Sequence, residues 1–120
     1  MEKISVIVPC YNEEETINYF YQKIVNVAAK LKKYEFEFLF IDDGSHDNTL
    51  KIIKELLNKD KRVKYISFSR NFGKEAAMFA GLEYSKGDYV TIMDADLQDP
   101  PDMLIDMLNI IKKEEYDIVG

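Results

Sequence analysis

The 120-residue sequence predicts an α/β fold in which helices cover both faces of an open, mostly parallel sheet. Short apolar runs rich in β-branched and aromatic residues alternate four times with longer amphipathic stretches, and a fifth apolar run begins near residue 116. Several of these runs have no polar face, which is typical of interior parallel strands that are covered on both sides. The alternation and the missing polar faces together indicate this fold class.

The first predicted strand covers residues 4–9, and Pro9 is expected to end it. Asn12 is the expected cap of the next helix, because Glu15 stands three residues later, as a capping box requires. Apolar residues then recur at three- and four-residue steps, which predicts one buried stripe. Its members are Ile17, Phe20, Tyr21, Ile24, Ala28 and Leu31.

The second predicted strand covers residues 36–41 and ends in the acidic pair Asp42 and Asp43. Ser45 or Asp47 can cap the helix that follows. That helix is expected to bury an apolar face made of Ile52, Ile53, Leu56 and Leu57.

A third strand is predicted at 63–68, and it leads through a polar loop into a helix at about 75–84. Small residues in this helix would let it lie close to a sheet. The fourth strand ends in an acidic cluster, and Pro100 and Pro101 suit the first turn of a further helix capped by Asp99. Residues 116–120 have the pattern of another buried strand, and because a domain rarely stops inside a strand, we expect a truncated chain.

The acidic cluster after the fourth strand has the chemistry of a metal site. Asp94 and Asp96 would point the same way from an extended backbone, and Gln98 would join them if the chain stays extended. Two close carboxylates resist ionising together unless a cation lies between them. Oxygen ligands of this kind suit Mg²⁺ or Mn²⁺. A solvated loop with a helix cap is the alternative interpretation.

Polar residues follow the predicted strands at four separate places. In open parallel sheets ligands bind beyond the carboxyl ends of the strands, where the strand order reverses. The polar groups at these ends are residues 11–13, Asp42 and Asp43, residues 70–74 and residues 94–98. Their common position favours a binding site over four unrelated solvated loops.

Composition excludes several classes of function. The chain carries 22 acidic and 16 basic residues, for a net charge of −6, and residues 88–117 hold nine acids against only two lysines, so a nucleic-acid partner is not expected. The single Cys10 excludes an internal disulfide. No apolar run reaches 18 residues and nothing marks a domain boundary, so we expect one folded unit located in the cytoplasm.

Four motifs in this order resemble those of family 2 glycosyltransferases with the GT-A fold, and most closely those of the polyprenyl-phosphate sugar transferases of the dolichyl-phosphate mannose synthase and bactoprenol glucosyltransferase type. The motifs are Val8-Pro9-Cys10-Tyr11-Asn12-Glu13, Ile41-Asp42-Asp43-Gly44-Ser45, Ser69-Arg70-Asn71-Phe72-Gly73-Lys74 and Asp94-Ala95-Asp96-Leu97-Gln98-Asp99-Pro100-Pro101. The likeness covers nearly the whole chain and implies the nucleotide-binding half of a Rossmann-like GT-A domain.

The resemblance also implies roles for individual residues. The nucleotide-binding set would be Pro9, Tyr11, Asn12, Glu13, Asp42, Asp43, Arg70, Lys74, Asp94 and Ala95. The Mg²⁺ or Mn²⁺ ligands would be Asp94, Asp96 and Gln98. Among the first set, Asp42 or Asp43 would bind the base or ribose, and Arg70 and Lys74 would lie near phosphate.

The implied reaction is an inverting transfer of a sugar from a UDP- or GDP-sugar to a lipid phosphate. Its general base is expected beyond Gly120. We therefore expect this stretch to bind donor weakly and to turn over poorly, in a full-length protein that is membrane-associated with this domain on the cytoplasmic face. An oligomer is compatible with the sequence.

Other interpretations compete with this one. A receiver domain has a similar length and an acidic Mg²⁺ site, but it needs acids after its first and third strands, and the third predicted strand here ends without one. A nucleotidylyltransferase would need a glycine-rich basic loop after the first strand, which is absent. A non-catalytic nucleotide-sugar-binding module is the remaining alternative.

Single residues also have simpler interpretations. Tyr11 could be a packing residue, and Asp43 could only close a turn and cap a helix. Arg70 and Lys74 could be solvated charges at a helix entry. Cys10 and His46 are expected to have no direct role.

Overall fold

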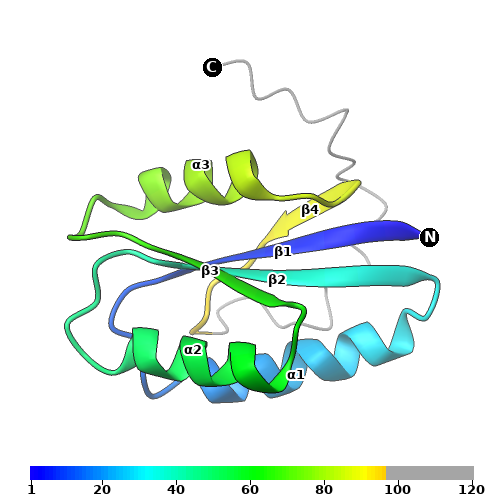
Figure 1. Cartoon of the computed structure of the whole chain (residues 1–120), viewed down its shortest axis with the longest axis horizontal. Helices are drawn as coiled ribbons and strands as arrows, with labels where there is room; N and C mark the ends of the chain where they lie inside the picture. Colours follow the sequence, from blue (N-terminus) through cyan, green and yellow to red (C-terminus); the bar gives the residue numbers. More distant parts are fainter. Residues whose placement is uncertain (97–120) are drawn as a thin grey trace.

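The computed structural model describes residues 1–96, which form a four-stranded parallel sheet with three helices (Figure 1). Along the chain the elements are β1 (Glu2–Cys10), α1 (Ile17–Lys30), β2 (Tyr34–Asp42), α2 (Thr49–Lys59), β3 (Val63–Ser67), α3 (Lys74–Tyr84) and β4 (Tyr89–Ile92). Helices α1 and α2 lie on one face of the sheet and α3 lies on the other. The predicted α/β class is confirmed.

The strands are ordered β3-β2-β1-β4, so the order reverses between β1 and β4. Strand β1 is therefore central and pairs in parallel with β2 on one side and with β4 on the other. All four carboxyl ends point to one edge of the sheet, where the predicted polar loops follow. This arrangement places the switch point of the sheet directly beside the loop after β1.

Alternate residues of the central strands supply two separate hydrophobic cores. Ile4, Val6 and Val8 face α1 and α2, whereas Ile7 faces α3. On the second face the small Gly81 brings α3 so close to the sheet that a Cβ at this position would lie 2.3 Å from Ile7 Cγ2. The prediction that small residues let this helix lie close to the sheet is confirmed.

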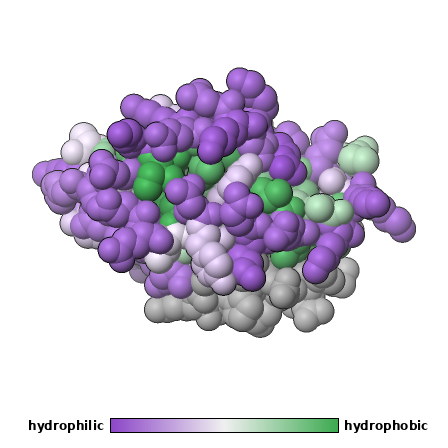
Figure 2. Space-filling model, turned by 90° about the horizontal axis from the view of Figure 1, so that it is seen from below, coloured by the Kyte–Doolittle hydropathy of each residue, from purple (hydrophilic) through white to green (hydrophobic). Residues whose placement is uncertain are grey.

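Helices α1 and α2 are amphipathic, as their apolar periodicity predicts. Buried side chains of α1 include Phe20 and Ile24, and Ile53 of α2 is fully buried. Figure 2, which shows this side of the molecule from outside, has a largely hydrophilic surface with smaller hydrophobic areas between the polar side chains. Within residues 1–96, no helix combines the length and the apolar character needed to span a membrane.

The expected end of the first strand at Pro9 is wrong, because β1 continues to Cys10 and Pro9 is in register with Ile41 of β2. A proline is tolerated here for a geometric reason. Ile7 O accepts a hydrogen bond from Met93 N, 2.9 Å away, so Pro9, two residues later, turns its backbone nitrogen to the β4 side as well. Proline has no N–H to donate, and the pairing of β1 with β4 ends before it, at Ile7 and Ile92.

The expected capping box of the first helix is also wrong. Helix α1 begins at Ile17, its N-cap is Thr16, and Asn12 has a φ of +52°. The Asn12 side chain accepts a hydrogen bond from His46 N, 2.8 Å away, instead of one from the helix. The Asn12 side chain thus bonds to another loop, although its spacing in the sequence predicts a helix cap.

Other boundaries differ from prediction by a few residues. Helix α2 has Asn48 at its N-cap position, although Asp47 Oδ1 still accepts a hydrogen bond from Thr49 N, 2.9 Å away. Strand β3 ends at Ser67 and α3 begins at Lys74. The predicted helix after Asp99 and the strand at 116–120 lie outside the described residues.

A polar network joins α1 to the loop between α2 and β3. Tyr21 donates a hydrogen bond to Asp60 Oδ2 at 2.6 Å, and Arg62 Nη2 lies 2.8 Å from the same oxygen. Burial raises the pKa of the Asp60 carboxyl, but hydrogen bonds from Arg62 and Tyr21 outweigh burial and lower this pKa from 3.8 to about 2. The network therefore stabilises the charged form of Asp60.

We expect this stabilisation to disappear in acid. Because the pKa of Asp60 is lower in the folded than in the unfolded state, its contribution is present above about pH 4 and is lost as the pH falls towards 2. Arg62 is partly exposed, so Asp60→Asn should lose only about 1 kcal/mol of unfolding free energy at pH 7. Urea unfolding at several pH values should show a smaller acid-induced loss in the variant, and parallel pH curves would contradict the assignment.

Candidate functional site

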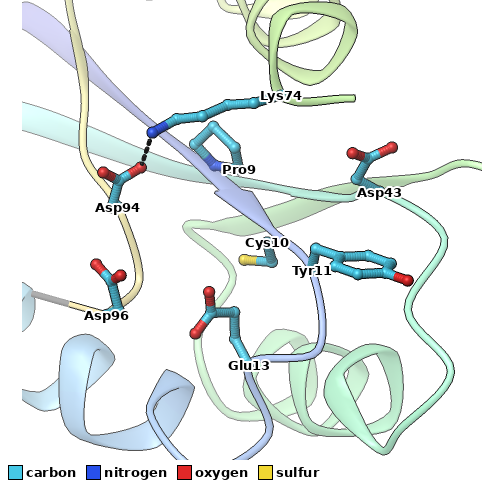
Figure 3. A pocket seen from close by; sticks show the side chains of 8 residues that line it. All are labelled: Pro9, Cys10, Tyr11, Glu13, Asp43, Lys74, Asp94 and Asp96. Carbon is cyan, nitrogen blue, oxygen red and sulfur yellow. Dashed lines mark ion pairs between the residues drawn. The ribbon is translucent and has the colours of Figure 1, made fainter. Parts of the chain in front are cut away.

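A cavity of about 240 Å³ opens at the carboxyl edge of the sheet, at the switch point between β1 and β4 (Figure 3). Its lining comes from the end of β1, from the loops after β1, β2 and β4, and from the first residue of α3. The lining residues are Pro9, Cys10, Tyr11, Glu13, Asp43, Lys74, Asp94 and Asp96. Side chains from four separate parts of the sequence thus meet at one place.

Most of the residues singled out in the sequence lie in this cavity, but four do not line it: Asn12, Asp42, Arg70 and Ala95. Gln98 lies outside the described residues. Cys10 was expected to have no direct role, yet it also lines the cavity.

Within residues 1–96, four carboxylates line the cavity, those of Glu13, Asp43, Asp94 and Asp96, against the single ammonium of Lys74. Asp94 and Asp96 lie on one side of the cavity, and Glu13 reaches up from the loop after β1 (Figure 3). Burial raises the pKa of Glu13, a hydrogen bond from Thr16 lowers it, and the charges of Asp96 and Asp94 raise it further. Burial also raises the pKa of the Cys10 thiol, and the charges of Glu13, Asp42 and Asp94 raise it further. The site therefore favours a cation.

Asp94 and Asp96 fit a hard divalent ion as a pair. Mg²⁺ and Mn²⁺ prefer oxygen donors, and Mg²⁺ is commonly held by one or two carboxylates together with waters and substrate phosphates. Within residues 1–96, no three His, Cys, Asp or Glu side chains are placed to enclose an ion by themselves. The two aspartates alone could therefore supply only part of the coordination of such an ion.

Lys74 is the only basic residue among the lining residues of the described chain. Its Nζ lies 2.7 Å from Asp94 Oδ1, and the pair is drawn as a dashed line in Figure 3. Arg70, predicted to act beside it, instead places its guanidinium 4.7 Å from the centroid of the Phe72 ring and is exposed. The two predicted phosphate-binding cations therefore occupy different positions, and only Lys74 reaches the cavity.

The structure separates the two acids at the end of β2. Asp42 is buried, and its carboxylate accepts hydrogen bonds from Ser45 N at 3.2 Å and Ser67 Oγ at 3.4 Å, within the turn and the neighbouring strand. Asp43 lines the cavity, and its carboxylate is hydrogen-bonded to the loop before α3. Its carboxylate accepts hydrogen bonds from Asn71 Nδ2 at 3.1 Å, Phe72 N at 2.8 Å and Gly73 N at 3.1 Å.

Asn12 has a supporting position that the sequence did not reveal. Asn12 N donates a hydrogen bond to Ser45 Oγ at 2.9 Å, and Glu13 N donates one to Thr49 Oγ1 at 2.8 Å. With the bond from His46 N, these contacts fasten the loop after β1 to the loop after β2. Asparagine is one of the few residue types that adopt positive φ readily, and its position in the short polar loop after the first strand was the available signal.

A family model described as Glycosyl transferase family 2 matches residues 5–120. The chain belongs to this family. The predicted resemblance to family 2 is therefore confirmed. The receiver interpretation is wrong, since family 2 covers nearly the whole chain and β3 ends at Ser67 with no acid after it.

Curated relatives are similar over most of this chain. It is 52% identical to a bactoprenol glucosyl transferase of Shigella phage SfV over 102 residues, which cover 85% of this chain and 33% of the relative. It is 44% identical to the uncharacterized glycosyltransferase YkcC of Bacillus subtilis, over 96% of this chain and 35% of the relative. The chain thus spans about a third of the length of these family 2 relatives.

Solved structures share the GT-A fold. S. aureus TarS 1-349 in complex with UDP matches with a TM-score of 0.66 at 33% identity, over 87% of this chain and 30% of that chain. The mannosyltransferase PcManGT from Pyrobaculum calidifontis, in complex with GDP-Man and Mn²⁺, matches with a TM-score of 0.73 at 24% identity, over the same shares. The second likeness bears on the fold alone.

Gly44 is expected to be essential for the close approach of the loops around Asp43. It has a φ of +72°, and a Cβ there would lie 2.2 Å from Arg70 C and 2.4 Å from Asn71 N. Gly44→Ala should therefore lower the unfolding free energy by about 2 kcal/mol or more, measured by urea denaturation.

Gly73→Ala is the matched control for this prediction. Gly73 also has positive φ, at +103°, but no atom lies within 4 Å of a Cβ placed there, so its substitution costs backbone strain alone. A loss at Gly44 no larger than the loss at Gly73 would contradict the prediction that the close approach adds to the cost.

Proposed function

We propose that the cavity binds a nucleoside-diphosphate sugar together with Mg²⁺ or Mn²⁺, and that the full-length protein transfers the sugar to a polyprenyl phosphate. The observation that carries this proposal is the pair Asp94 and Asp96 beside Lys74, at the switch point of the sheet. Carboxylates and an ammonium side by side suit a metal-bound diphosphate, whose charges they complement.

The nucleoside would lie at the end of the cavity formed by Tyr11 and Asp43. Tyr11 is 42% exposed and meets the His46 ring edge to face, with 6.5 Å between the centroids, so the exposed part of its ring would contact the base. A carboxylate has about four acceptor positions, and three hydrogen bonds from the loop before α3 already reach that of Asp43. About one position is left for a donor group on the base or ribose. TarS, at 33% identity, is described in complex with UDP, which supports a nucleotide ligand here.

The diphosphate would lie at the opposite end of the cavity, near Asp94, Asp96 and Lys74. A bound divalent ion would act as a Lewis acid that neutralises the negative charge of the leaving nucleotide. Asp94 and Asp96 would hold this ion, and the Lys74 ammonium would stabilise the same developing charge directly. Gln98, which lies outside the described residues, stays a predicted third ligand.

The acceptor is proposed to be a lipid phosphate that attacks the anomeric carbon with inversion. A phosphate monoester has a second pKa near 6, so this nucleophile is largely anionic and needs little help from a general base. Relatives named bactoprenol glucosyl transferase support a lipid acceptor. A full-length protein that uses such an acceptor would work at the membrane surface, with this domain on the cytoplasmic side.

Asp96→Asn tests the metal and the donor together. The substitution removes one carboxylate charge from the proposed ligand pair and should weaken Mn²⁺-dependent binding of UDP or GDP at least about tenfold, equivalent to 1.4 kcal/mol. Isothermal titration calorimetry with each nucleotide, with and without Mn²⁺, gives the measurement. It also shows which nucleotide the protein prefers.

Glu55→Gln is the matched control, since it removes one carboxylate charge from an exposed position on α2. Its nucleotide binding should equal that of the unmodified protein. Unchanged Mn²⁺-dependent binding in Asp96→Asn would refute the assignment of this residue to the metal. Transfer from the preferred nucleotide sugar to a polyprenyl phosphate, assayed with the full-length protein, tests the acceptor.

A further inference from the structure

Lys74 forms an ion pair with Asp94, one of the proposed metal ligands. Its ammonium lies 2.7 Å from Asp94 Oδ1, and the side chains are 58% and 25% exposed respectively. Figure 3 shows the lysine stem reaching from the start of α3 across the cavity to the segment after β4. The ammonium thus lies against one of the two oxygens of the carboxylate that would hold the metal ion, and the two cations would compete for Asp94.

The stability of the fold gives little reason for this pair. Ion pairs between side chains this exposed contribute about 0–1 kcal/mol, because solvent screens the charges. A lysine in the first turn of a helix also faces the positive end of the helix dipole, which disfavours a cation there. A function in the cavity explains the position of Lys74 better than a contribution to α3.

The backbone before Lys74 is fixed, while its side chain can move. Asp43 accepts hydrogen bonds from Phe72 N and Gly73 N, the two residues directly before Lys74, so the start of α3 is tied to the end of β2. The lysine side chain beyond this anchor is a flexible four-carbon stem whose ammonium has three rotatable donors. A change of partner would therefore need rotation of the side chain only.

We propose that Lys74 is a counter-cation built into the site. Its ammonium neutralises Asp94 before metal binds, is displaced by the incoming divalent ion, and then pairs with the diphosphate that the ion accompanies. This inference rests on the proposed metal site. It adds an order of binding, in which the metal ion enters together with the nucleotide rather than alone.

The order follows from the charges that change partners. An ion that binds without nucleotide must break the pair of Lys74 with Asp94 and leaves the ammonium without an anion. An ion that arrives with a diphosphate supplies the ammonium with a new anionic partner at the same moment. Lys74 should therefore weaken the binding of the ion alone and strengthen the binding of the ion with nucleotide, a coupling of typically fivefold or more.

The test compares Lys74→Met with Lys59→Met. Both remove one exposed lysine charge, but Lys59 is the last residue of α2, at the end away from the cavity. Mn²⁺ affinity is measured without nucleotide by electron paramagnetic resonance of the free ion, and then with whichever of UDP and GDP binds the unmodified protein. Lys74→Met should bind Mn²⁺ alone about fivefold more tightly and nucleotide with Mn²⁺ about fivefold more weakly, while Lys59→Met changes neither affinity.

Asp94→Asn separates failure of this inference from failure of the metal site. One outcome refutes the counter-cation role of Lys74 and leaves the metal site standing. In that outcome Asp94→Asn loses Mn²⁺ binding in the presence of nucleotide, but Lys74→Met binds Mn²⁺ alone no more tightly than the unmodified protein. If Asp94→Asn binds Mn²⁺ as the unmodified protein does, the metal site and the inference both fall. Circular dichroism of each variant should match the unmodified protein, since the side chain of Lys74 is mostly exposed.

Discussion

Parallel pairing of β1 with both β2 and β4 is the constraint on which the site depends. This pairing brings the carboxyl ends of three strands to one edge, so the loops that follow them meet although they are far apart in sequence. Pro9 adds to the effect, because it has no N–H to offer to the β4 side, where the pairing has already ended. The segments that follow β1 and β4 are no longer paired, and the cavity opens between these two segments.

The fold holds acidic side chains together against their mutual repulsion. Glu13, Asp94 and Asp96 share one cavity, and the raised pKa of Glu13, caused first by burial and then in part by the two aspartates, reflects this repulsion. Hydrogen bonds between the loops after β1 and β2 offset the cost by fixing the backbone on one side. Such stored repulsion is released when a cation binds, which is why a negatively charged cavity favours a metal-dependent ligand.

Sequence reasoning placed the strands and the polar loops well because strand periodicity is a local property. It failed where a side chain has a choice between a local and a distant partner. Asn12 has the spacing of a helix cap but bonds to His46 N in another loop. Arg70 and Lys74 look equivalent as cations near a helix start, yet one stacks on Phe72 and the other crosses the cavity. These outcomes depend on which loops the sheet brings together.

By itself the sequence determined the α/β class, the family, and the strand ends whose polar residues border the cavity, Asp94 and Asp96 among them. This was possible because the periodicity of apolar residues and the residue types of strands and loops can be recognised within short segments. Only the tertiary structure decided that Asp43 rather than Asp42 lines the cavity, and that Lys74 pairs with Asp94. Asp42 is the last residue of β2 and Asp43 is the first residue after it, so the contacts between loops decide which of the two acids borders the cavity.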